Sequence, residues 1–166
     1  MSPVSTIDPR VRAHIADASN LEELGAVART AARRLARSDG ATFVLKDGDH
    51  CFYADEDAIA PLWKGQRFSI DECISGWSML NGEPAVVPDI ATDERIPHAV
   101  YRSTFVRSLV MVPVGDPAAA AIGAYWATEA SHADAVPVLV ELAGLVASRL
   151  DEMGIADAPW APNFKI

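Results

Sequence analysis

Two long segments near the ends of the chain repeat hydrophobic residues at helical spacing. In residues 20–38, leucines and alanines recur every three or four positions, which places them on one face of a helix. Ser19, followed three residues later by Glu22, is typical of a capping box and marks the expected start of this helix. The same spacing predicts a second long helix over 134–153, and a short helix is expected over 10–18.

Hydrophobic runs of strand length lie between these helices. The runs 42–45 and 50–53 flank an Asp-Gly pair, which predicts an antiparallel hairpin. The runs 109–114 and 120–128 are continuously apolar, as is typical of central strands buried on both faces. The other expected elements are short strands at 67–69 and 85–87, an acidic loop at 55–57, a short helix at 74–80 and a mixed polar connection at 91–107.

This order of elements predicts an α+β fold built on one antiparallel sheet of five or six strands. The two long terminal helices would cover one face of the sheet, and the short helix with the segment 89–107 would cover the other. A connection of this length without a long helix of its own is more often a binding loop than a spacer. We expect an N-terminal extension at 1–18, a domain at 19–154 and a C-terminal tail at 155–166.

Composition and charge limit the possible partners. The 166 residues include 14 Lys and Arg against 23 Asp and Glu, a net charge of −9, and half of them are hydrophobic. A chain of this length can bury a full core as one domain. The acidic balance and the lack of a Lys/Arg run argue against nucleic acid and anionic membrane as partners. Neither a signal peptide nor a membrane-spanning run is recognisable, so we expect a cytoplasmic protein.

The chain has two cysteines, Cys51 and Cys73. In a reducing compartment, two cysteines are expected to be free thiols in or near the core rather than a disulfide framework. The neighbouring acidic residues Asp49 and Asp71 argue against an activated thiolate.

Residues 74–90, ISGWSMLNGEPAVVPDI, resemble the central signature of GAF domains, in which a glycine, a helix, a Gly-x-Pro turn, a strand and an aspartate follow one another. The segments 93–98, 101–106 and 108–114, with a closing strand at 122–126, resemble the form found beside bacterial sensor histidine kinases. The resemblance covers roughly residues 18 to 153.

The resemblance implies a PAS-related fold and a signalling module that senses a small molecule or dimerises, and not an enzyme. GAF domains hold ligands between the sheet and the loop that corresponds here to 89–107. Polar and aromatic groups in this region would recognise a small anionic or carbonyl ligand. The candidate ligand-binding residues are Trp77, Asp89, Arg95, His98, Tyr101, Arg102, Phe105 and Trp126.

Structural roles remain open for several of these residues. Arg95 and Arg102 could pair with Asp89, Asp93 or Glu94 and simply hold the loop in shape. The aromatic candidates could be core residues, and the sequence does not assign which of Tyr125 and Trp126 faces the ligand.

Known GAF subfamilies provide specific comparisons. Covalent bilin attachment uses a cysteine in or near the loop, and residues 91–107 contain none, so a bilin cofactor is not expected. Haem ligation by His98 is disfavoured because that histidine has no evident partner. The Asn-Lys-Phe-Asp-Glu signature of cyclic-nucleotide domains is absent. Relatives that reduce free methionine sulfoxide need several cysteines near the small helix, and only Cys73 is present there, which disfavours reductase activity.

The sequence therefore predicts a module that binds an unidentified small ligand non-covalently, with no cofactor or metal. The terminal helices would form a homodimer through small residues such as Ala26, Ala32, Ala143 and Ala147, and would relay the signal to a partner protein in trans. The alternative is a ligand-free GAF scaffold for protein–protein association.

Overall fold

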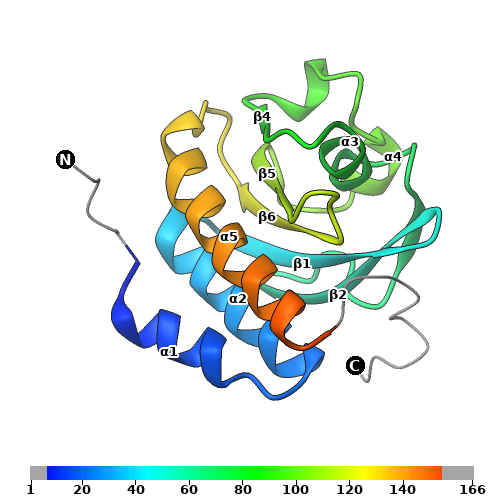
Figure 1. Ribbon diagram of the computed structural model, residues 1–166. Coiled ribbons are helices and arrows are strands. Elements are labelled where there is room, and N and C mark those ends of the chain that lie inside the picture. Colours follow the sequence, from blue (N-terminus) through cyan, green and yellow to red (C-terminus); the bar gives the residue numbers. More distant parts are fainter. Residues whose placement is uncertain (1–6, 155–166) are drawn as a thin grey trace.

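Six antiparallel strands form one sheet in the order β3-β2-β1-β6-β5-β4. The computed structural model describes residues 7–154 (Figure 1). The hairpin around Asp-Gly is present, and the two apolar runs near the C-terminus form the adjacent strands β5 and β6. The strands are β1 (Gly40–Asp47), β2 (His50–Ala58), β3 (Arg67–Ser69), β4 (Ala85–Val87), β5 (Ser108–Val114) and β6 (Ala120–Trp126).

Helices cover both faces of this sheet. The long helices α2 (Leu21–Ala36) and α5 (Val136–Glu152) lie side by side on one face, and α1 (Pro9–Asp17) packs beside them (Figure 1). A single 3-10 turn, η2 (Ala133–Ala135), leads into α5. The opposite face carries α3 (Ile74–Asn81), the 3-10 turn η1 (Ile90–Thr92) and α4 (His98–Tyr101). The predicted α+β architecture is confirmed, with six strands and with two short helical turns inside the connection that was expected to be irregular.

The core is divided in two by the sheet because alternate strand residues face opposite sides. On β1, Phe43 and Leu45 pack under the long helices, whereas Val44 packs under α3 and α4. On β6, Trp126 belongs to the helix-side core and Tyr125 to the opposite core. Both faces of the central strands are therefore buried, as their continuous apolar runs predict.

The ends of α2 differ from the predicted ones by a few residues. Asn20 is the N-cap, and its side chain accepts a hydrogen bond of 2.9 Å from the Glu23 amide. Glu23 reaches back to the amide and hydroxyl of Ser19, so the capping box is present one residue later than predicted. At the other end Arg37 adopts a left-handed conformation with φ 54° and caps the helix, and β1 begins at Gly40.

The acidic segment 55–57 is the second half of β2 rather than a loop. Asp55 and Asp57 face α2, where Arg29 Nε lies 2.9 Å from Asp55 and Arg33 Nη1 lies 2.7 Å from Asp57. Both arginines are half-buried in these ion pairs with the strand. The strand continues through this segment because its residues pair with β1, and the ion pairs with α2 compensate the charges of the two carboxylates.

Residues 1–6 of the predicted extension and the predicted tail at 155–166 lie outside the described residues. Within residues 7–154, none of the helices is both long and apolar enough to cross a lipid bilayer.

Candidate functional site

Four aromatic side chains meet between the sheet and the short helices of the α3–α4 side. We call Tyr53, Trp63, Tyr101 and Tyr125 the aromatic cluster; they come from β2, the β2–β3 connection, α4 and β6. The Trp63 ring centroid lies 4.7 Å from that of Tyr101, 5.4 Å from that of Tyr125 and 5.5 Å from that of Tyr53. Each side chain is at most 3% exposed. Trp63 is therefore the common contact of three tyrosines that sequence-distant elements supply.

The position of Trp63 is set by the carboxylate of Glu56. A β-bulge interrupts the β1–β2 register at Ala54, and two residues further along, Glu56 turns its side chain to the connection that follows β2. Its carboxylate accepts hydrogen bonds of 2.8 Å from the backbone amides of Leu62, Trp63 and Lys64. The connection has no strand partner at this point, so one anion satisfies three amides that would otherwise lack acceptors.

Two of the three tyrosine hydroxyls are hydrogen-bonded. Tyr125 Oη lies 2.9 Å from Thr42 Oγ1, and Tyr53 Oη lies 3.1 Å from Ser75 Oγ. Gly123 leaves the space for the first pair, because a Cβ at this position would lie 2.6 Å from Tyr125 Oη. Burial raises the pKa of both tyrosines, so they are neutral donors or acceptors at physiological pH.

The hydroxyl of Tyr101 is different, because it is buried and has no hydrogen-bond partner among the residues that the structure describes. Desolvation holds its pKa well above the ordinary tyrosine value, so the group keeps its proton. Trp63 lies against the same turn, and its Nε1 donates to the carbonyl of Val100 at 3.2 Å. A buried hydroxyl without a partner costs about 1–3 kcal/mol relative to one that is hydrogen-bonded. The aromatic cluster thus contains one buried polar group without a hydrogen-bond partner among the described residues.

Three of the four polar side chains predicted for the loop bond to other groups of the same segment. Arg95 forms a bidentate pair with Asp93, with its Nη2 2.7 Å from one carboxylate oxygen, and its guanidinium lies 4.4 Å above the Trp77 ring. The hydrogen bond from Arg95 lowers the pKa of Asp93. His98 is exposed, with Nε2 2.9 Å from the Ile90 carbonyl. Of the two roles left open for Arg95, the structure shows the pairing that holds the loop in shape.

Three further candidates complete this region. Asp89 is half-buried and caps η1, accepting from the Ala91 amide at 2.9 Å. Arg102 is exposed, whereas Phe105 is half-buried, packs against the core on this side and approaches Gly40. Among the predicted residues, Tyr101 is the one that enters the aromatic cluster.

Trp126 lies on the opposite face of the sheet from the other candidates. Its ring stacks on His132 at 3.7 Å between centroids, and its Nε1 donates to the Arg37 carbonyl at 3.1 Å. Its neighbour Tyr125 takes the place at the site, because adjacent strand residues point to opposite faces. This answers the question that the sequence left open, and it separates Trp126 from the ligand region expected for it.

Two thiols border the aromatic cluster. Cys51 on β2 and Cys73 just before α3 are both buried, and their Sγ atoms are 3.1 Å apart. Ser75 connects them to the cluster, because its Oγ lies 3.4 Å from Cys73 Sγ as well as 3.1 Å from Tyr53 Oη.

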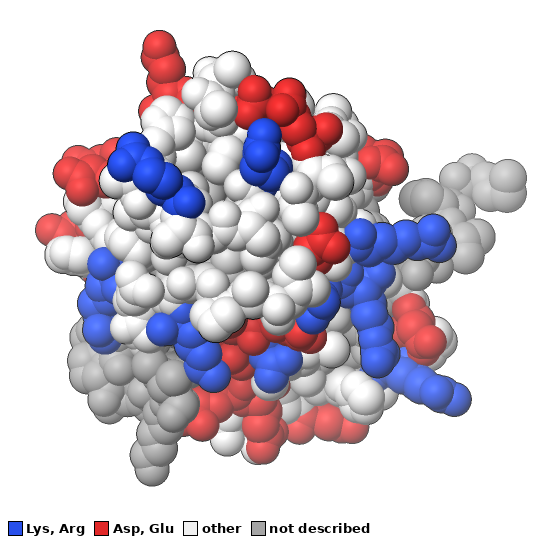
Figure 2. All heavy atoms as spheres, turned by 180° about the vertical axis from the view of Figure 1, so that it is seen from behind, with Lys and Arg blue, Asp and Glu red and all other residues white. Residues whose placement is uncertain are grey.

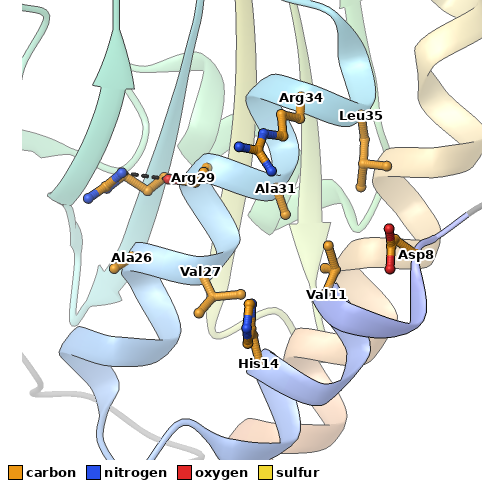
Figure 3. Close-up of a pocket in the computed structure, with 10 residues that line it drawn as sticks. Asp8, Val11, His14, Ala26, Val27, Arg29, Ala31, Arg34 and Leu35 are labelled. Atoms are coloured by element: carbon orange, nitrogen blue, oxygen red, sulfur yellow. Dashed lines mark hydrogen bonds between the residues drawn. The ribbon is translucent and has the colours of Figure 1, made fainter.

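A groove of about 430 Å³ lies on the other side of the molecule, between α1 and α2. In Figure 3 the side chain of His14 from α1 lies next to Val27 of α2, while Arg29 is turned away to Thr30. On the face seen from behind, basic and acidic side chains lie next to one another along the lower part (Figure 2). The groove between α1 and α2 is therefore mainly apolar. The face seen in Figure 2 carries charges of both signs.

Sequence reasoning missed two of the four residues of the aromatic cluster. Tyr53 was assigned only to a hairpin strand, and Trp63 to none of the predicted helices or strands. Thr42 and Ser75 gave no signal, because they are single hydroxyls in apolar runs.

One antiparallel sheet thus carries long helices on one face and short helices with irregular segments on the other. A family model described as GAF domain matches residues 18–151, and the chain belongs to this family. The search of curated proteins finds no match.

Solved structures show the same fold at low sequence identity. A free methionine-R-sulfoxide reductase from Neisseria meningitidis, determined with its substrate, superposes with a TM-score of 0.75 at 19% identity, covering 88% of this chain and 87% of that one. The GAF domain of an Acinetobacter phosphoenolpyruvate-protein phosphotransferase gives 0.73 at 13% identity, covering 87% and 90%. The chromophore-binding domain of Stigmatella aurantiaca phytochrome P1 gives 0.66 at 14% identity, covering 89% and 62%.

Proposed function

We propose that this chain is a regulatory GAF module that binds a small, largely apolar ligand non-covalently at the aromatic cluster. The observation that carries the proposal is the buried Tyr101 hydroxyl without a partner. A polar atom of a ligand would supply the missing hydrogen bond, and the rings of Trp63 and its neighbours would supply flat apolar contact. The described conformation is then the closed, ligand-free state.

The segment 88–107 is suited to open, because its polar contacts are largely internal to it. Asp93 binds Arg95, and the Ile90 carbonyl binds His98. These bonds can be kept while the segment moves as a unit, so opening breaks apolar contacts, the contact of Arg95 with the Trp77 ring and the bond from Trp63 Nε1 to Val100. At the C-terminal end of the segment, the Arg107 amide is bonded to the Trp126 carbonyl at 2.8 Å, so this end stays attached to β6. Ligand binding would then select the open arrangement from an existing equilibrium.

Strand β6 offers a route from the ligand side to the long helices. The carbonyl of Tyr125 accepts a hydrogen bond of 2.9 Å from the Asp39 amide, just after α2. The next residue, Trp126, is bonded to the Arg37 carbonyl at the end of α2. A shift of Tyr125 on ligand binding would therefore reach the C-terminal end of α2 through two direct contacts.

We further propose that the helical layer pairs with a second copy of the chain and acts on a signalling protein in trans, in a cytoplasmic two-component setting of the sensor-histidine-kinase kind. Val140 of α5 is 45% exposed, and the groove between α1 and α2 adds apolar surface. Ala32 and Ala143 are buried in the chain's own core, so they do not form this interface.

Native mass spectrometry tests the ligand proposal. The purified protein would be measured before and after incubation with a small-molecule extract of bacterial cells, and again after denaturation. We expect a dimer that carries an adduct, which denaturation removes and the Tyr101→Phe variant retains less well. A dimer with no adduct under either condition would contradict ligand sensing and support the alternative of an association scaffold.

One observation favours the alternative of a ligand-free scaffold. Arg95 and Asp93 neutralise each other through two hydrogen bonds, so neither charge is needed to bind a ligand. A catalytic function is not part of the proposal, although one of the similar structures is a reductase. Incubation with free methionine-R-sulfoxide and excess dithiothreitol checks this point. We expect no methionine above the uncatalysed background, and turnover that disappears in Cys73→Ser would contradict the expectation.

A further inference from the structure

The two cysteines form a close pair although they lie 22 residues apart in sequence. Cys51 is in β2, opposite Phe68 of the edge strand β3, and Cys73 is the N-cap residue of α3. The chain returns from β3 to α3 within a few residues, and the Ile70 amide donates to the Asp49 carbonyl at 2.8 Å. The backbone on both sides is therefore held, and the 3.1 Å between the sulfur atoms follows from the fold.

The two sulfur atoms have different surroundings. Cys51 is fully buried on the sheet, whereas Cys73 is 6% exposed and follows the exposed residues Asp71 and Glu72. Ser75 Oγ donates to Cys73 Sγ at 3.4 Å, and Cys73 lies at the N-terminus of a helix, where amides and the dipole favour an anion.

These contacts make Cys73 the thiol that ionises. The hydrogen bond from Cys51 lowers the pKa of Cys73 to about 7, helped by Ser75 and the Gly76 amide, while burial and Asp71 act in the opposite direction. The same hydrogen bond and burial raise the pKa of Cys51, which keeps its proton. The expectation that Asp71 prevents activation overlooked the helix terminus and the second thiol.

We infer that Cys51 and Cys73 form a redox-active dithiol site whose oxidant is hydrogen peroxide. The Cys73 thiolate attacks the peroxide O–O bond, so that an S–OH bond forms and hydroxide leaves and is protonated to water. Cys51 then attacks the sulfenic sulfur, an S–S bond forms, and the hydroxyl leaves with the Cys51 proton as a second water. The two thiols lose two electrons and the peroxide gains two.

The disulfide would join β2 to the start of α3 at the edge of the aromatic cluster. Ser75 is bonded to both Cys73 and Tyr53, so a change at the sulfur pair reaches a residue of the ligand site. The oxidation itself does not depend on the proposed ligand. A module without any ligand could still form the disulfide, and a ligand-binding module could lack it.

Peptide mapping after oxidation tests the inference. The fully reduced protein is treated with a small molar excess of hydrogen peroxide, quenched with an alkylating reagent and digested without reductant. We expect an intact mass lower by two hydrogen atoms, a linked peptide that contains Cys51 and Cys73, and restoration of both thiols by dithiothreitol. Sulfinic or sulfonic acid on Cys73 without the linked peptide would overturn the pairing.

Single variants test the order of the two steps. Cys51→Ser leaves Cys73 without a resolving thiol, so dimedone should label Cys73 after peroxide treatment. In Cys73→Ser, dimedone labelling of Cys51 should be at least about tenfold slower, because that thiol remains protonated. Equal labelling of the two variants, or faster labelling of Cys51, would overturn the assignment.

A comparison within the wild-type protein covers the case in which a variant fails to fold. Disulfide formation is timed in native protein and in protein unfolded in urea at the same pH. The inference predicts that the native fold forms the linked peptide faster, because it holds the two sulfur atoms together. An equal or slower native rate would contradict a built site.

Discussion

Replacing Glu56 by glutamine tests whether one carboxylate holds the wall of the aromatic cluster. The carboxylate accepts three backbone amides at 2.8 Å, of which those of Leu62 and Trp63 are partly buried and that of Lys64 is exposed. Glutamine keeps the shape but offers one acceptor oxygen, and its NH2 group would face the Leu62 amide. The partly buried Leu62 amide is left without an acceptor, and the amides of Trp63 and Lys64 are bonded to a neutral oxygen instead of an anion.

The magnitude follows from these losses. An unsatisfied buried donor costs about 1–3 kcal/mol, and a bond to a neutral acceptor is weaker by about 1 kcal/mol than one to an anion. Counting the unsatisfied Leu62 amide and the weakened Trp63 bond, but not the exposed Lys64 bond, we expect Glu56→Gln to lower the free energy of unfolding by about 2–4 kcal/mol. With a urea m-value of about 2 kcal/mol/M, the unfolding midpoint would fall by about 1–2 M.

Urea unfolding followed by far-UV circular dichroism measures this effect. Glu83→Gln is the matched control, because Glu83 is exposed and a surface change of this kind alters stability by less than about 0.5 kcal/mol. Tryptophan fluorescence at zero urea should also show greater accessibility to acrylamide in Glu56→Gln. A midpoint equal to that of the control would refute the anchoring role of Glu56.

Two further predictions concern Gly76, whose backbone lies against the Ile70 carbonyl, and the ion pair of Arg95 with Asp93. A Cβ at Gly76 would collide with the Ile70 carbonyl, so Gly76→Ala should destabilise the protein by about 1–3 kcal/mol in urea unfolding. Gly144→Ala is the control, because Gly144 is in an open position on α5, and it should stabilise the protein by about 0.5–1 kcal/mol. If the Gly76→Ala variant were the more stable of the two, the close packing of α3 on the Ile70 carbonyl would be contradicted. Because Arg95 lowers the pKa of Asp93, the pair stabilises the fold above the unfolded-state pKa and loses this effect as the pH falls below about 4. The stability difference between wild type and Arg95→Met should therefore shrink over that range, and a constant difference down to pH 2.5 would contradict it.

Elements and topology could be predicted from the sequence because their signals are local. Periodicity located the long helices, and the continuous apolar runs located the central strands. The main error, the loop at 55–57, arose because the charges that favour a loop are cancelled by Arg29 and Arg33 from another element. Pairing between distant segments is not visible in a local pattern.

The site was predicted less completely for the same reason. Arg95 and His98 carry conspicuous chemistry, but their partners are a few residues away in the same segment. The inward-facing group is Tyr101, and its neighbours Trp63 and Tyr125 come from elements that meet only in the folded chain. The sulfur pair likewise depends on β2 and α3 being adjacent.

Thermal unfolding of Tyr101→Phe, with and without the bacterial small-molecule extract, tests the central claim most directly. Removal of a buried hydroxyl without a partner should raise the Tm of the ligand-free protein by roughly 2–4 °C for each kcal/mol gained. The same variant should lose most of the Tm increase that the extract produces in wild type. A lower ligand-free Tm together with an undiminished response to the extract would contradict a ligand site at the Tyr101 hydroxyl.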